Sequence, residues 1–138
     1  MGVNREAAKG YQVAQQLWSI LPKASDESRN AALTRLSIFY NQIEDYQATI
    51  NAASSVISSS EDPRSICYAY YTLVEAKYNL KLELDPGKIE SYSKHCEKEG
   101  EVNVQAILNI YQARVLHDVG QSTAAIELLK VTKPLLEI

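Results

Sequence analysis

The stretch IFYNQIEDYQATI, from Ile38 to Ile50, decides the fold of this chain. An aromatic pair precedes a short polar break, and apolar residues at helical spacing follow it, which is typical of a turn between two helices. The pattern then returns twice. If Glu44 marks the first break, Leu82 and Gly120 mark the next two at a spacing of 38 residues, give or take one. Three matched hairpins at one period predict a repeated structural unit.

Helices are predicted along the whole chain. Glycine (5) and proline (4) are rare, and between them apolar residues recur every three or four positions over segments of 14 to 20 residues. No segment alternates polar and apolar residues as a strand would. The first helix is predicted at about residues 4–21. The residues predicted to begin or end helices are Pro22, Asp26, Asp85 with Pro86, Gly100 and Pro134.

Composition bounds the class of protein. With 138 residues and 46% hydrophobic residues, the chain is predicted to form one domain, residues 1–138. A formal charge of -3 and the lack of a basic stripe argue against nucleic-acid binding. No apolar run approaches the roughly 18 residues of a membrane span, and no signal peptide is evident. A soluble, cytoplasmic protein is expected.

Cysteine and histidine offer little chemistry. Cys67 and Cys96 are expected to be small buried hydrophobic residues in a reducing compartment, because a chain of this size needs no disulfide. With His95 and His117 they do not have the spacing of metal ligands. No nucleophile elbow or glycine-rich phosphate loop is present. We therefore expect no metal, no cofactor and no catalysis.

Two segments resemble tetratricopeptide units: EDYQATI at residues 44–50 and ARVLHDVGQSTAAIELL at residues 113–129. In that family a small residue in the first helix lets the second helix approach, a glycine makes the turn, and an alanine lies in the second helix. Ala113, Gly120 and Ala125 match these positions. Elsewhere the chain departs from the family: Glu75 stands at the close-packed small position, and the period of 38 exceeds the usual 34 or so.

The resemblance implies a fold. An all-α, right-handed superhelical array of antiparallel helix pairs is expected, with about seven helices. The repeats would span about residues 30–62, 63–100 and 101–138, and the helix at residues 4–21 would be a cap or a half repeat. Because the last segment is still apolar, the chain is also read as a possible fragment of a larger protein.

The resemblance also implies a binding site for protein or peptide. In this family the first helices of successive units line a concave groove. At the 38-residue offset Asn41, Asn79 and His117 fall on one line, where side-chain amides could hold an extended peptide backbone. Thr34, Ile38 and Thr72 would form the floor. The predicted groove residues are Thr34, Ile38, Asn41, Gln42, Thr72, Asn79, Arg114 and His117.

Two alternatives remain open. The chain could be a regulatory or dimerising segment of a larger bacterial signalling protein with a nucleotide-cyclase or DNA-binding output domain. It could also form a homodimer through its terminal helices, since the segment AIELLKVTKPLLEI is apolar to its end. The nine tyrosines, against one phenylalanine, suit either core packing or a recognition surface.

Overall fold

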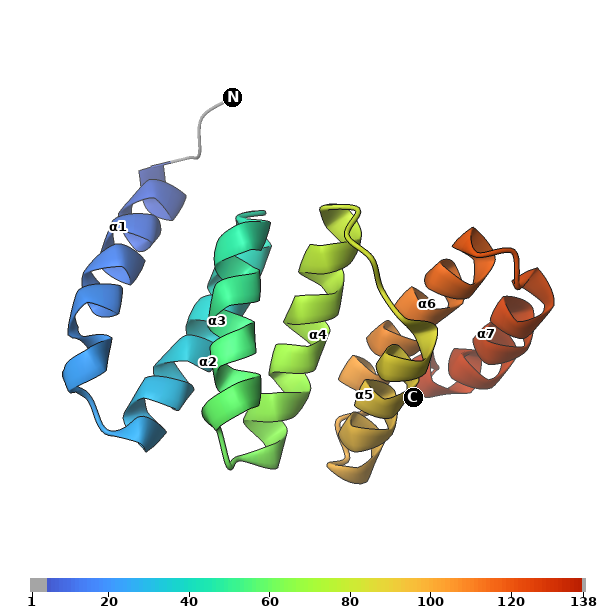
Figure 1. The fold of residues 1–138 in the computed structure, drawn as a ribbon. Helices are drawn as coiled ribbons and strands as arrows, with labels where there is room; N and C mark the ends of the chain where they lie inside the picture. Colours follow the sequence, from blue (N-terminus) through green and yellow to red (C-terminus); the bar gives the residue numbers. More distant parts are fainter. Residues whose placement is uncertain (1–4, 138) are drawn as a thin grey trace.

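Seven α-helices and one short 3-10 turn make up residues 5–137, the part of the chain that the computed structural model describes. The prediction of an all-α fold with about seven helices is confirmed. Successive helices run antiparallel and form an open row in which α1 and α7 lie at opposite ends (Figure 1). The elements are α1 (Arg5–Ile20), η1 (Leu21–Lys23), α2 (Asp26–Gln42), α3 (Tyr46–Ser59), α4 (Pro63–Asn79), α5 (Pro86–Lys98), α6 (Val102–Asp118) and α7 (Ser122–Leu136).

Short polar side chains cap the starts of α2, α3, α4 and α5. The Asp85 side chain accepts a hydrogen bond from the Gly87 backbone N–H, and Pro86 follows at the first helical position, as predicted. The expectation that Asp26 caps α2 is wrong by one residue. Ser25 is the cap, since its side chain accepts from the Ser28 N–H, and Asp26 is the first helical residue.

Residues in the left-handed conformation follow α2, α4, α5 and α6. Gly100 has φ of 74°, which confirms its predicted role after α5. Glu44 and Gly120 also have positive φ, but the middle turn residue is Lys81 rather than the predicted Leu82. Pro134 lies inside α7, which continues to Leu136, so the proline does not end the helix.

Each helix pair packs on the next. Helix α3 packs against both α2 and α4, and α5 packs against α6 and, less extensively, against α4. The first helices of the pairs also contact one another directly, α2 with α4 and α4 with α6. Apolar side chains of neighbouring pairs are therefore buried against one another.

The core follows this row as three clusters of buried side chains rather than as one centre. The first joins α1, α2, α3 and α4 around residues such as Leu33 and Val56, and the second joins α4, α5 and α6 around Ile89 and Leu108. A small third cluster around Ala113 joins α6 and α7. Each fully buried aliphatic side chain contributes roughly 1.5–3 kcal/mol by leaving water.

Helix α1 docks on α2 mainly through aromatic side chains. The Trp18 indole N–H donates to the Tyr40 hydroxyl at 2.6 Å, and the rings of Tyr11 and Tyr40 meet edge to face at 6.0 Å. Gly10 lies so close to Phe39 that an added Cβ would be 3.0 Å from its ring. The absence of a side chain at Gly10 therefore lets α1 approach α2.

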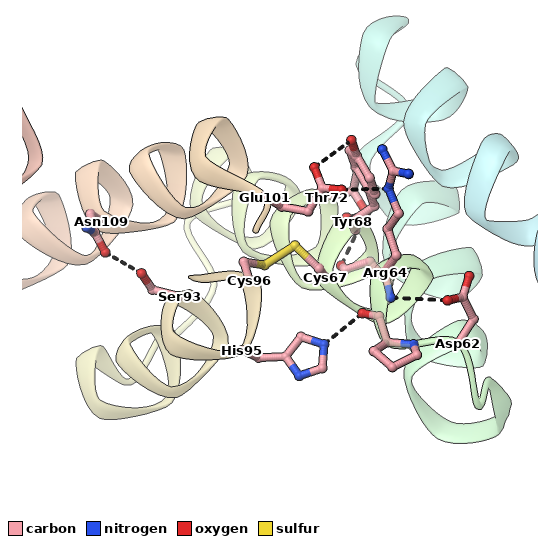
Figure 2. The surroundings of a disulfide bond; sticks show 12 residues. Asp62, Arg64, Cys67, Tyr68, Thr72, Ser93, His95, Cys96, Glu101 and Asn109 are labelled. Carbon is pink, nitrogen blue, oxygen red and sulfur yellow. Dashed lines mark hydrogen bonds and ion pairs between the residues drawn. A yellow bond between two sulfur atoms is a disulfide. The ribbon is translucent and has the colours of Figure 1, made fainter. Parts of the chain in front are cut away.

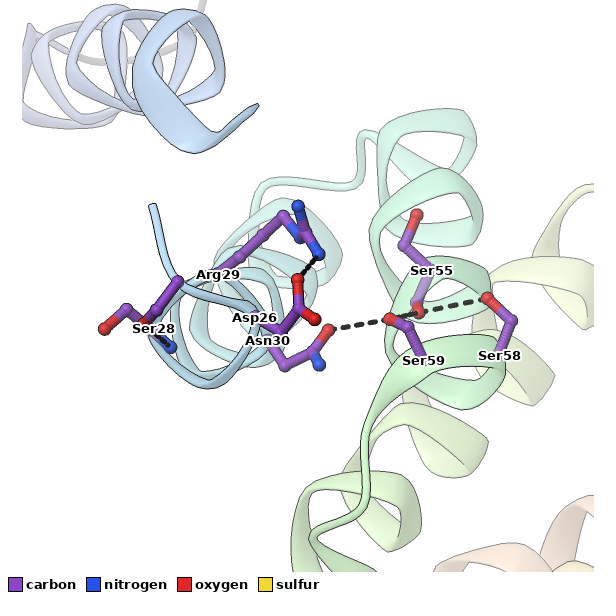
Figure 3. A network of polar contacts seen from close by, with 8 residues as sticks. Asp26, Ser28, Arg29, Asn30, Ser55, Ser58 and Ser59 are labelled. Carbon is purple, nitrogen blue, oxygen red and sulfur yellow. Dashed lines mark hydrogen bonds and ion pairs between the residues drawn. The ribbon is translucent and has the colours of Figure 1, made fainter. Parts of the chain in front are cut away.

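A polar network ties the start of α2 to the end of α3 (Figure 3). The Ser59 hydroxyl donates to the Asn30 side-chain carbonyl at 2.9 Å, and Arg29 pairs with Asp26 on the same helix. A hollow of about 590 Å³ lies beside it, lined by serines and by Asp26, Glu27, Glu61 and Asp62. We assign this network a structural role, since the Ser59–Asn30 hydrogen bond joins α3 to α2.

Candidate functional site

The register of the first helices decides which side chains share a surface. Lys81 lies 37 residues after Glu44, and Gly120 lies 39 residues after Lys81. The helix starts at Asp26, Pro63 and Val102 show the same two spacings. A constant spacing of 38 therefore places the residues of α4 one position too late. The observed spacings of 37 and 39 still lie within the range of 38, give or take one, that the sequence predicted.

The corrected register defines the surface that we call the first-helix face. Equivalent positions of α2, α4 and α6 fall on three lines that cross the row of helices. Most of the side chains on these lines are partly or fully exposed, and only Thr34 is buried. The lines are Thr34, Tyr71 and Ile110; Ile38, Glu75 and Arg114; and Asn41, Tyr78 and His117.

Two of the predicted floor residues lie below this surface. Thr72 is fully buried, and its hydroxyl contacts the Ser37 hydroxyl at 3.3 Å. Thr34 is 8% exposed and donates to the Asn30 backbone carbonyl in its own helix. The Thr72 hydroxyl therefore joins α4 to α2, whereas the Thr34 hydroxyl bonds within its own helix. Ile38 remains partly exposed on the face.

The predicted polar line is not continuous. Asn41 and His117 occupy equivalent positions, but Tyr78 lies between them in place of Asn79. Asn79 is exposed at the end of α4 and donates to the Glu75 backbone carbonyl at 2.8 Å. Gln42 is likewise exposed in the last turn of α2. Arg114 is on the face and exposed, and His117 contacts the Ser122 hydroxyl at 3.0 Å.

Glu75 is the main residue of the face that the sequence did not indicate. The resemblance assigned it to the close-packed small position, but Val74 fills that position and is fully buried, like Ser37 in α2. Glu75 therefore points toward the neighbouring first helices, and its carboxylate accepts a hydrogen bond from the Asn41 side-chain amide at 2.9 Å. A correct register would have placed Glu75 on the face beside Tyr71.

Tyrosine hydroxyls surround this carboxylate. Burial, followed by the charge of Glu75 and hydrogen bonding to it, raises the pKa of Tyr71 to about 12. The same causes raise the pKa of Tyr111, and the positive charge of Arg114 opposes the shift. Both hydroxyls are thus protonated at neutral pH and available as donors to Glu75.

Arg114 lies on the same side of α6. Its guanidinium is 5.7 Å from the centre of the Tyr78 ring and 5.2 Å from that of Tyr111, within the range of a cation–π interaction. The two rings meet at 5.4 Å, and the Tyr78 hydroxyl reaches the Asp118 carboxylate at 3.4 Å. The aromatic pair therefore orients the arginine.

Neither charge is neutralised by an ion pair within residues 5–137. The salt bridges of this part of the chain involve other groups, such as Arg64 with Glu101 and Lys94 with Glu90. In addition, the side-chain oxygen of Asn41 is buried and lacks a hydrogen-bond donor among the described residues. The first-helix face thus carries polar groups that the fold itself leaves incompletely satisfied.

A hollow of about 600 Å³ adjoins the face where α4 and α6 end. Tyr78 and Asp118 belong to its lining, so it continues from the aromatic pair that holds Arg114. Exposed Leu82 and Val119 make much of the remaining wall apolar. This hollow therefore combines an apolar wall with the charged side chains of Lys81, Glu83 and Asp118.

The cysteines form a disulfide, and the expectation of two unpaired cysteines is wrong. Cys67 of α4 and Cys96 of α5 are bonded, with their Cα atoms 5.2 Å apart and both residues fully buried (Figure 2). Their separation of 29 residues gave no sequence signal, because no short Cys spacing marks a pair. The bond joins the two helices of the middle pair.

Polar contacts around the disulfide hold α4 against α5 and the start of α6. The Glu101 carboxylate pairs with the Arg64 guanidinium at 2.6 Å and accepts from the Tyr68 hydroxyl at 3.2 Å (Figure 2). The His95 imidazole contacts the Pro63 carbonyl at 2.7 Å. Since α4 and α6 both contribute to the first-helix face, this region sets their relative position.

Residues 5–137 contain neither a candidate metal site nor a helix that could span a membrane. No group of three or more histidine, cysteine, aspartate or glutamate side chains could hold a metal ion in that part of the chain. Over the same residues, no helix has the length and apolarity that crossing a membrane requires.

Comparison with known proteins gives no relative. No family model matches the chain, and neither the curated proteins nor the solved structures contain a significant match.

Proposed function

We propose that this chain is a tetratricopeptide-like helical repeat module that binds a protein or peptide on its first-helix face and has no catalysis of its own. The repeats would form a right-handed array in which α2, α4 and α6 line the concave side. The open row of helices and the repeated left-handed turns support this proposal.

One observation carries the proposal: Glu75 and Arg114 both lie on the first-helix face without an ion-pair partner among the described residues. A carboxylate and a guanidinium held by tyrosines, but not by opposite charges, are typical of surfaces that gain their partners on binding. Tyrosine and arginine are also the residues that dominate binding energy at interfaces.

Selection from a displayed library of random peptides tests this proposal. The full chain should enrich a defined set of peptides, and Arg114→Ala with His117→Ala should weaken their binding about tenfold or more. Lys98→Ala, which removes an exposed cation from α5, is the control and should leave affinity unchanged. Enrichment of no peptide would refute binding on this face. So would equal affinity of the wild type and of the variant with Arg114→Ala and His117→Ala for the enriched peptides.

A second candidate function is self-association within a larger signalling protein. Helix α7 favours it because the apolar side chains of Ile126, Leu129, Val131 and Leu136 are exposed. The mass measured in solution should then rise with protein concentration, and Val131→Glu should abolish the rise. A constant monomer mass over a hundredfold range of concentration would remove this candidate.

The cysteines bear on the compartment. A cytoplasmic location is expected from the sequence both because no signal peptide is evident and because the cysteines are expected to be unpaired, and the buried Cys67–Cys96 disulfide removes the second of these reasons. We propose an oxidising compartment instead, because structural disulfides persist there and are rare in reducing ones.

A further inference from the structure

The partner's chemistry can be inferred from the middle line of the first-helix face. This line runs from Ile38 on α2 through Glu75 on α4 to Arg114 on α6. It therefore presents an apolar, an acidic and a basic side chain in order along the row of helices. The other two lines each carry uncharged side chains on α2 and α4, so the middle line holds the distinctive charge pattern.

The Glu75 carboxylate would be stabilised by a cation from a partner. Its carboxylate is partly buried, and the neighbours that approach it are neutral donors: the Asn41 amide and the hydroxyls of Tyr71 and Tyr111. Neutral donors orient a carboxylate but leave its charge in place, and a partly buried charge gains most from an opposite one. A carboxylate has about four acceptor positions, so one more donor can be accommodated.

The Arg114 guanidinium can bind an anion from a partner. The rings of Tyr78 and Tyr111 hold the guanidinium at one place, while the side chain as a whole stays exposed. An arginine that stacks on aromatic rings keeps the N–H groups at its edge free for a bidentate contact with a carboxylate. Because its freedom is already restricted, less entropy is lost when that contact forms.

The distance between packed helices sets the spacing of the partner's side chains. Axes of packed helices are about 8–10 Å apart. An extended polyproline-like chain rises about 3.1 Å per residue and brings every third residue to the same side, which gives roughly 9 Å. Side chains three residues apart on such a peptide therefore meet adjacent first helices.

We propose that the first-helix face binds an extended peptide whose residues at positions i, i+3 and i+6, read in one of the two chain directions, are apolar, basic and acidic. The apolar residue lies on Ile38, the basic residue pairs with Glu75, and the acidic residue pairs with Arg114. This inference rests on the proposed function and names the partner that the function requires.

Fluorescence anisotropy with short synthetic peptides tests the inference on the full chain. The matched peptides carry Leu, Lys and Glu at the three positions, in either order along the chain, and the swapped peptides exchange Lys and Glu. At least one matched peptide should bind ten or more times as tightly as its swapped counterpart. Equal affinities, or absence of binding by every matched peptide, would overturn the inference.

Charge reversal on the protein gives the second arm. Arg114→Glu, at an exposed position, should favour a peptide with Lys at the third position over the matched one, and Lys98→Glu on α5 should change nothing. Glu75→Gln should reduce the preference for Lys at the middle position, with circular dichroism as a check on folding. Failure of Arg114→Glu to shift the preference would also overturn the inference.

The two proposals fail separately. If the peptide library yields binders that lack this charge pattern, and Arg114→Ala with His117→Ala weakens them, the face binds peptides but the charge pattern is wrong. If the library yields no binder, the proposed function itself is refuted.

Discussion

Glu75 shows that a shift of one residue in the register moves a side chain from a buried position to the surface. At a constant offset it falls at a close-packed position, where a carboxylate would be costly. In the structure Val74 is buried there, and Glu75 lies among Asn41, Tyr71 and Tyr111. The sequence could predict Ile38, Asn41 and Arg114 as surface residues of the first helices. It could not place Glu75, because helical periodicity tolerates a shift of one residue.

The tyrosines beside Glu75 predict a loss of stability at high pH. The pKa of Tyr71 is raised to about 12, so its hydroxyl is still protonated in the folded state when the unfolded chain, with a pKa near 10, has lost the proton. The contribution of Tyr71 to the free energy of unfolding should stay constant below pH 10. It should then fall by about 1–2 kcal/mol as the pH rises to 12.

Urea denaturation between pH 8 and pH 12 measures this effect. Tyr71→Phe has no proton to lose and should show a shallower decline than the wild type, and Tyr71→Phe with Tyr111→Phe a shallower one still. A decline of the same slope in all three proteins would show that these hydroxyls are not the cause.

The connections between helices show what local sequence can and cannot predict. Gly100 and Asp85 with Pro86 have the residue types that their positions require, and the sequence predicted them correctly. The turn residues Glu44 and Lys81 have side chains that disfavour a left-handed conformation, with φ of 62° and 58°. No local signal marked Lys81, so the middle turn was placed one residue late.

Glycine at these turns should stabilise the protein. Lys81→Gly removes the steric cost of positive φ and should raise the free energy of unfolding by roughly 0.5–1 kcal/mol. Gly120→Ala is the converse change and should lower it by about 1 kcal/mol, because φ there is 85°. Thermal or urea denaturation checks both variants, and a destabilised Lys81→Gly would contradict the assigned turn.

The disulfide contributes to stability at the level of the middle helix pair. It closes a loop of 29 residues between α4 and α5, which restricts the unfolded chain. Removing it with Cys67→Ala and Cys96→Ala should lower the free energy of unfolding by about 3–4 kcal/mol. Mass spectrometry after alkylation in denaturant is the control: thiols that react without a reducing agent would show that the bond is absent.

At the scale of the whole molecule, the sequence predicted an all-α chain because its apolar residues recur at helical spacing throughout. Contacts between helices that are far apart in the sequence could not be predicted from this spacing. The contact of Asn41 with Glu75 and the bond between Cys67 and Cys96 both join helices that periodicity alone leaves independent. The open row of helices is what brings the charged groups of α4 and α6 onto one surface.

The most direct test of peptide binding is to map a bound peptide by nuclear magnetic resonance. The full chain, labelled with nitrogen-15, is titrated with the tightest peptide from the library. The account predicts that the chemical-shift changes concentrate on α2, α4 and α6 around Ile38, Glu75 and Arg114. Changes confined to α3, α5 and α7 would contradict it.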